Sequence, residues 1–272
     1  MKLRPTLVAG IAAAALTLTA CGGGAEQAAS DEASNVSSGT TATLTQANFV
    51  DQVGQAQREA RTTHLTLKAD AGSQQVEAEG DVEVGESGAD SSMAMKLTVP
   101  GMGQVEVRLV DGTLYTNLGP LSENKFATID LDDPSNPLAK SFGGVVDQMD
   151  PAASLKALEG SITSFEKKGS PKEIDGVQAQ PYEVVVDTAK AQAAAGAGAE
   201  ASGSTAGVPS EVTATFWVGE DNLPRRVTTQ VSGADVRLDF SKWGEDVDVQ
   251  APPADQITKN DPFKGALPTP TS

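Results

Sequence analysis

The chain has one histidine and one cysteine in 272 residues, and aromatic residues make up only 4% of it. A single cysteine cannot form an internal disulfide, so an ordinary apolar core must hold the fold together. A single histidine, His64, leaves a His-rich metal site or a Ser-His-Asp relay without a supporting motif. The scarcity of aromatic side chains means that the interior must be mostly aliphatic.

Basic residues are also scarce, because 20 Lys and Arg stand against 37 Asp and Glu and give a formal net charge of −17 at pH 7. An acidic surface repels nucleic-acid phosphates and anionic lipid head groups. We therefore predict no nucleic-acid partner, and we expect any attachment to a membrane to depend on something other than surface charge.

The N-terminal segment carries Lys2 and Arg4, then an apolar run that ends at Ala20, and then Cys21. This is the layout of a signal peptide, and the run is shorter than the roughly 20 residues that a membrane-spanning helix needs. A small residue directly before a cysteine resembles the bacterial lipobox. That resemblance implies that residues 1–20 are a lipoprotein signal peptide and that acyl chains such as palmitate are attached to Cys21. We expect a lipid anchor at the outer face of the cytoplasmic membrane.

Two stretches and the tail are poor in large apolar residues. Residues 21–43 are mostly Gly, Ala, Ser, Thr, Glu and Gln, which bury too little area to offset the entropy of ordering, and we interpret them as a flexible tether. Residues 189–209 are a low-complexity loop insertion, although the Ala-rich start at 188–195 also suits a helix. Residues 261–272 are predicted to be a disordered tail. One domain of 44–260 remains, which is an ordinary size.

The domain opens with a helical pattern and continues with the period of a strand. Phe49, Val53, Ala56 and Ala60 recur at helical spacing, with Thr45 as the predicted N-cap. Apolar and polar residues then alternate, which is typical of a sheet with one apolar and one wet face. The alternating segments are 65–69, 76–84, 93–99, 105–109, 114–118, 125–130, 162–168, 178–187, 211–218, 225–232 and 236–241.

Two further helices interrupt this series of strands. Leu138, Phe142, Val146 and Met149 share one face of the first, and a shorter one that carries Leu155 and Leu158 follows. Many antiparallel strands with a few helices predict an α+β domain. Because a flat sheet does not comfortably hold so many strands, we predict a strongly curved antiparallel sheet that forms a half-open β-barrel, covered by a few helices.

No residue pattern selects a catalytic centre. The strand pattern places His64 on the polar side with Thr66 and Lys68, and the acidic residues of 77–83 share one solvent-facing side. Three aspartates at 130–133 lack the glycine and glutamate of a hand-type calcium loop. We predict no catalytic residue, no metal site and no cofactor, and we do not expect an enzyme.

Three segments carry a family resemblance. They are Phe216-Trp217-Val218-Gly219 through Leu223-Pro224-Arg225-Arg226-Val227, the stretch from Asp175-Gly176-Val177 to Tyr182-Glu183-Val184, and the ending Val249-Gln250-Ala251-Pro252-Pro253. With the lipobox and the order of elements, they resemble the actinobacterial LppX/LprA/LprF/LprG lipoproteins. The resemblance implies a LolA/LolB-like fold whose concave face encloses a hydrophobic cavity. It also implies a carrier that moves acylated lipid or glycolipid within the cell envelope.

The residues expected to line such a cavity are the apolar ones of the curved sheet and of the first covering helix. They are Met93, Met95, Leu97, Val105, Val107, Leu109, Phe216, Val227, Val231, Leu238 and Phe240 from the sheet, and Leu138, Phe142, Val146 and Met149 from the helix. The same alternation also builds a filled core, so packing is the alternative for each of them. Trp217 is out of phase and is expected at the surface or at the cavity mouth, and Arg225 and Arg226 are candidates for a lipid phosphate or for ion pairs.

Three functions follow from these patterns. The first is a membrane-anchored lipoprotein that binds acylated lipid or lipoglycan in a hydrophobic cavity and carries it in the cell envelope, with an envelope transporter or acceptor protein as its partner. The alternative is a LolA-like protein-interaction or envelope-stress sensor module without lipid cargo. A cell-wall hydrolase is the weakest of the three, because no acid/base pair stands out.

Overall fold

The computed structural model describes most of the predicted domain. The chain divides into two units, Met1–Thr40 and Thr41–Ser272, and the sheet and its helices belong to the second. The described residues are 43–72, 75–85, 90–101, 103–133, 139, 155, 158–195 and 209–258. The predicted signal peptide, nearly all of the predicted tether and of the helix predicted at 138–149, residues 196–208 and the predicted tail lie outside them. No helix within the described ranges is both long and apolar enough to cross a membrane.

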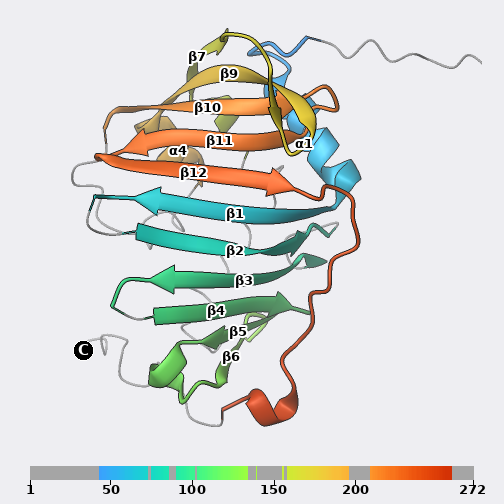
Figure 1. Ribbon diagram of the computed structural model, residues 1–272, viewed down its shortest axis with the longest axis vertical. Coiled ribbons are helices and arrows are strands. Elements are labelled where there is room, and N and C mark those ends of the chain that lie inside the picture. The colour runs from blue at the N-terminus through green and yellow to red at the C-terminus, as the bar shows by residue number, and fades with distance from the viewer. Residues whose placement is uncertain are drawn as a thin grey trace, which may run out of the picture. The chain divides into compact units, whose positions relative to one another are not determined.

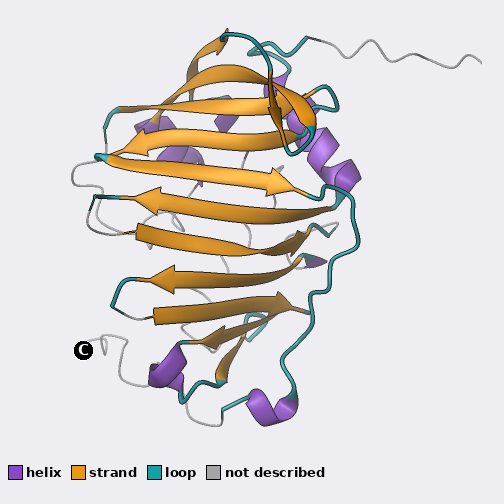
Figure 2. Cartoon of the chain, in the orientation of Figure 1, coloured by secondary structure: helices purple, strands orange, loops and turns teal. Residues whose placement is uncertain are grey.

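All twelve strands in the described residues belong to one antiparallel sheet, shown in Figures 1 and 2. The strands are β1 (Thr62–Asp70), β2 (Gln75–Glu83), β3 (Ser92–Val99), β4 (Gly103–Val110), β5 (Thr113–Asn117), β6 (Phe126–Asp130), β7 (Ile162–Lys167), β8 (Lys172–Ile174), β9 (Val177–Asp187), β10 (Glu211–Gly219), β11 (Pro224–Val231) and β12 (Ala234–Ser241). Their order is β6-β5-β4-β3-β2-β1-β12-β11-β10-β9-β7, and β8 pairs with β9. Because β6 and β7 at the two ends are not paired with each other, the sheet is not closed.

The register places the apolar residues of neighbouring strands opposite one another. Leu67 on β1 is paired with Leu238 on β12 and with Ala78 on β2, and Ala78 is paired in turn with Leu97. Opposed residues of an antiparallel pair share a face. One face of the sheet, which we call the apolar face, therefore carries this row. The residues that alternate with it along each strand lie on the other face, which we call the polar face.

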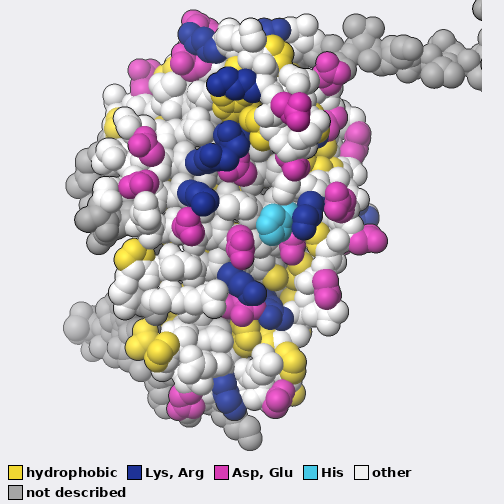
Figure 3. Space-filling view, viewed as in Figure 1, with side chains coloured by type: hydrophobic (Ala, Val, Ile, Leu, Met, Phe, Trp, Pro, Cys, Tyr) yellow, Lys and Arg dark blue, Asp and Glu magenta, His cyan; other side chains and the backbone are white. Residues whose placement is uncertain are grey.

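The polar face bears charged groups of both signs. Its residues include His64, Lys68, Glu77, Glu79, Asp81, Lys96, Glu106, Arg108, Arg226, Arg237 and Asp239. Figure 3 shows Lys and Arg side chains beside Asp and Glu over the strands, with the single histidine among them. The predicted alternation of an apolar and a wet face is confirmed.

Tight turns join several of the strands. Asp111 and Gly112, between β4 and β5, have φ angles of 49° and 68°. Two successive positive φ angles make a type I′ turn, whose twist matches that of the strands it joins. Asp175-Gly176, between β8 and β9, and Ser232-Gly233, between β11 and β12, have the same pair of positive φ angles and form the same kind of turn.

Helix α1 (Phe49–Ala60) confirms the first predicted helix, but its N-cap is Asn48 and the prediction of Thr45 is wrong. The side-chain oxygen of Asn48 accepts a hydrogen bond from the backbone N–H of Thr45 at 2.7 Å, so Thr45 belongs to the preceding turn. A second helix, α4 (Thr188–Ala195), forms at the Ala-rich start of the low-complexity stretch.

The main core cluster lies where α1 packs on the apolar face of β7, β9 and β10. The Phe49 ring lies 5.1 Å from that of Phe165 and 5.2 Å from that of Phe216, and Phe165 stacks on Tyr182 at 5.3 Å. Leu155, which is helical as predicted, is buried in the same cluster. Few aromatic residues are present in the chain, and four of them meet here.

The chain after β12 runs along the ends of β1 to β4 and reaches β6 (Figure 1), and we call residues 242–258 the C-terminal strap. Gly244 donates a backbone hydrogen bond to Thr62, and the Arg108 guanidinium donates to the Gln250 carbonyl at 3.0 Å. Ile257 forms a parallel bridge with Phe126. The strap therefore ties the middle of the sheet to its β6 edge.

Candidate functional site

The sheet residues predicted to line a cavity all lie on the apolar face, and their burial differs. Met93, Met95, Leu97, Val107, Phe216, Val227, Val231, Leu238 and Phe240 are half-buried. Val105 and Leu109 are buried, Leu109 being 1% exposed. The helix residues Leu138, Phe142, Val146 and Met149 lie outside the described residues. The lining role of each residue stays a prediction.

The apolar face is closely packed toward both ends of the sheet. Toward β7, the side chains of Tyr182, Val184 and Val218 are buried in the cluster under α1. Toward β6, Leu109, Leu114 and Ile129 are buried as well. The two regions are the packed ends of the apolar face.

Between the packed ends, large apolar side chains remain partly accessible. We call this region the open middle, and it consists of Leu65, Leu67, Met93, Met95, Leu97, Val227, Leu238 and Phe240 on strands β1, β3, β11 and β12. These strands adjoin one another with β2 between β1 and β3, where the small Ala78 is buried. A run of half-buried aliphatic groups on a curved sheet can accept another apolar chain, because each CH₂ removed from water contributes about 0.8 kcal/mol.

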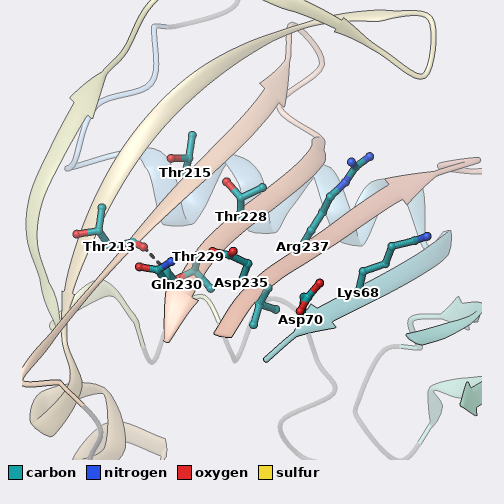
Figure 4. A pocket seen from close by; sticks show the side chains of 10 residues that line it. Lys68, Asp70, Thr213, Thr215, Thr228, Thr229, Gln230, Asp235 and Arg237 are labelled. Atoms are coloured by element: carbon teal, nitrogen blue, oxygen red, sulfur yellow. Dashed lines mark hydrogen bonds between the residues drawn. The ribbon is translucent and has the colours of Figure 1, made fainter. Parts of the chain in front are cut away.

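Helix α1 reaches from a packed end to the open middle. Figure 4 shows it passing behind β10, β11 and β12, on the opposite side of the sheet from Thr228, Arg237 and Lys68. Its buried residues are Phe49, Val50, Val53, Gly54 and Gln57. Sequence reasoning missed Gln57, although its place four residues after Val53 puts it on the same stripe. A polar residue at such a position is the signal that could have identified it.

Two arginines considered for lipid phosphate are both ion-paired. Arg225 is 6% exposed, lies on the strand face that also bears Val227, and pairs with Asp221 in the turn before β11. Arg226, on the polar face, donates from Nε to Asp239 Oδ1 at 2.5 Å. Of the two roles expected for these arginines, a contact with lipid phosphate or an ion pair, the structure contains the ion pairs.

The polar face is hollowed where β1, β10, β11 and β12 adjoin. A hollow of about 520 Å³ is lined by Lys68, Asp70, Thr213, Thr215, Thr228, Thr229, Gln230, Asp235, Val236 and Arg237 (Figure 4). The pKa of Asp70 is lowered by the hydrogen bond from the Gln75 side chain and then by that from the Gly72 backbone. The hollow carries charges of both signs, from Lys68 and Arg237 and from Asp70 and Asp235.

His64 and Trp217 both lie on the polar face, and each contacts a charged side chain. His64 Nδ1 is 2.7 Å from Asp81 Oδ1, and the His64 side chain is 26% exposed. Lys172 Nζ lies 5.2 Å from the centroid of the Trp217 ring, which gives a cation–π contact. Trp217 therefore lies at the surface and not at the mouth of a cavity on the apolar face. Within the described ranges, no three His, Cys, Asp or Glu side chains are grouped as metal ligands.

One family model matches most of the chain. The model of the LppX_LprAFG lipoprotein family matches residues 45–249. No curated protein matches the chain.

Two of the solved structures that match the chain are from mycobacteria. LprF from Mycobacterium bovis is 14% identical, with a TM-score of 0.51, and the alignment covers 76% of this chain and 96% of that one. LppX from Mycobacterium tuberculosis is 15% identical, with a TM-score of 0.49, and the alignment covers 76% of this chain and 100% of that one. At such identities the likeness to LprF shows a shared fold and leaves the ligand open.

Proposed function

Since the chain belongs to the LppX_LprAFG lipoprotein family, we propose that it is a lipid-anchored carrier that binds acylated lipid or lipoglycan on the apolar face of its open sheet. The anchor in this proposal is the acylated Cys21, which holds the protein at the outer face of the cytoplasmic membrane. The role is non-enzymatic, and the protein shelters cargo as it moves within the cell envelope.

The observation that carries this proposal is the half-burial of the open middle. Leu67, Leu238 and Met95 lie on the apolar face of β1, β12 and β3, and their side chains are only half-buried. A filled core would bury such side chains almost entirely. The two methionines of β3 add adaptable side chains, which suits acyl chains of variable length.

The energetics favour a protein shelter for such cargo. A lipid with two long acyl chains costs on the order of 20 kcal/mol to expose to water, at about 0.8 kcal/mol per CH₂. Spontaneous transfer between membranes is therefore slow. An apolar surface that covers even part of the chains lowers this cost and allows the lipid to travel.

The test is native mass spectrometry of the Cys21→Ala protein without residues 1–20, expressed in a host of its own envelope type. We expect a stoichiometric lipid, identified after organic extraction. Met95→Trp and Val107→Trp each fill the apolar face with a larger side chain and are expected to reduce the bound fraction several-fold. Thr98→Trp, an exposed position on the polar face of the same strand β3, is the matched control and should retain the lipid.

A folded protein that stays free of lipid, even after incubation with envelope lipids, would contradict the proposal and favour a protein-binding module. Circular dichroism of each variant separates a loss of lipid from a loss of fold. Retention of the lipid in both Met95→Trp and Val107→Trp would move the binding site away from the apolar face.

A further inference from the structure

Gln57 is an unusual residue in the buried stripe of α1. Its side chain is 7% exposed. Its Oε1 atom is buried and has no hydrogen-bond partner within the part of the chain that the structure describes. Among the described residues, it is the one buried side-chain oxygen or nitrogen atom of which this is true. Two other buried polar residues contrast with it: Ser161 donates to the Leu158 carbonyl at 2.7 Å, and Thr63 donates to the Ser241 carbonyl at 3.1 Å.

The fold gives no reason for a carboxamide at this position. Buried polar groups in proteins almost always have partners, because an unsatisfied one is destabilising. Leu has about the same helix propensity as Gln and would extend the apolar stripe of Phe49 and Val53 by one more turn. No described residue supplies a partner for Oε1, which leaves it available to a group of a bound molecule.

The location of Gln57 indicates what that group is. Val53, one turn earlier, belongs to the core cluster over β9 and β10. The helix then crosses β11 and β12 (Figure 4) and ends at Ala60, two residues before β1 begins. Gln57 thus lies in the half of α1 that leads from the packed end to the open middle, where Leu238 and Phe240 are half-buried.

We propose that the Gln57 carboxamide recognises a free hydroxyl group next to the acyl chains of the bound lipid, with Oε1 as the hydrogen-bond acceptor. The ligand class is an acylated lipid with an unesterified glycerol or sugar hydroxyl. This inference rests on the proposed carrier function and adds a selectivity to it. The Gln side chain has a broad terminal torsion, so the amide can turn toward a hydroxyl that enters beside α1.

Two probes that differ by one hydrogen-bond donor test the idea. They are 1,2-dipalmitoylglycerol and its 3-O-methyl ether, which have the same acyl chains. We expect the wild-type protein to bind the alcohol about tenfold more tightly than the ether, the discrimination given by one buried hydrogen bond. Gln57→Leu should lose this preference and bind the two equally. Gln55→Leu, which makes the same change on the exposed side of α1, should keep it.

A spectroscopic readout separates recognition from packing. In ¹⁵N-labelled protein, the side-chain NH₂ resonances of Gln57, assigned by their loss in Gln57→Leu, should shift on addition of the alcohol and not of the ether. Gln57→Met, whose flexible chain fills a similar volume, replaces Gln57→Leu if the leucine variant does not fold.

The outcomes distinguish the two proposals. Binding of both probes with equal affinity in the wild-type protein would overturn the role of Gln57 and leave the carrier function intact. The same holds if the preference survives in Gln57→Leu, since another group would then recognise the hydroxyl. Binding of neither probe, in a folded protein that also fails to retain envelope lipid, would overturn both.

Discussion

The packed end under α1 and the open middle are built from the same alternation of residues, yet their side chains differ in burial. Val184 and Tyr182 on β9 are buried beneath Phe49 of the helix. Leu238 on β12 and Leu67 on β1 occupy equivalent positions on the same face and are half-buried. The packed end is covered by α1, whose Phe49 ring contacts Phe165 and Phe216.

This difference separates stability from function within one sheet. Packed regions contribute most of the free energy of folding, since they remove the most apolar area from water and leave no voids. A region that binds cargo must instead leave some apolar area unfilled. Substitutions at the packed end should therefore reduce stability more than lipid binding, and substitutions in the open middle should reduce lipid binding more than stability.

The largest expected effect is that of Phe49→Ala at the packed end. Phe49 is 1% exposed and its ring contacts Phe165 and Phe216. Loss of a buried Phe typically costs about 3–5 kcal/mol, because the cavity that is left relaxes only in part. Urea denaturation of the lipid-free protein measures the free energy of unfolding. A loss below about 1 kcal/mol would show that the end under α1 is not packed as described.

A pair of leucine truncations is expected to have smaller and unequal effects. Leu109→Ala removes a side chain that is 1% exposed and should cost about 2–5 kcal/mol. Leu238→Ala, in the open middle, should cost only about 1 kcal/mol, since the side chain is already partly hydrated. With lipid bound the second value should rise, because the ligand completes the burial of Leu238. Equal losses in the lipid-free protein would remove the distinction between the two regions.

The sequence predicts most of the sheet and little of this distinction. Alternating residues such as Leu65, Leu67 and Ala69 identify a strand and its apolar face, and Asp111-Gly112 identifies a hairpin. The family resemblance was confirmed by the family model. Strand β8 was missed, because three residues from Lys172 to Ile174 are too few to show a period.

Burial within the apolar face cannot be predicted from periodicity, because alternation gives the same pattern whether or not another element covers the strand. Leu109 and Leu97 were predicted to have the same role, and only Leu109 is fully buried. The side chain of Trp217 could be placed on the opposite face by its phase, but its contact with Lys172 depends on β8. Gln57 was missed for a related reason, since the predicted stripe of α1 followed apolar residues alone.

The smallest expected effect is a pH dependence confined to alkaline solution, and it reports on how well the packed end excludes water. Burial raises the pKa of Tyr182 above its usual value. Between the unfolded pKa of about 10 and the higher folded pKa, the folded protein binds more protons, so the free energy of unfolding falls as pH rises. Tyr182→Phe removes the titrating group and should reduce this alkaline loss, while leaving stability at pH 7 nearly unchanged because the ring still stacks on Phe165. Tyr115→Phe, on the polar face of β5, should retain the loss. Urea denaturation from pH 8 to pH 11 measures the free energy of unfolding of the three proteins. If this free energy falls equally steeply with pH in the wild-type protein and in Tyr182→Phe, water reaches the phenol despite the helix above it.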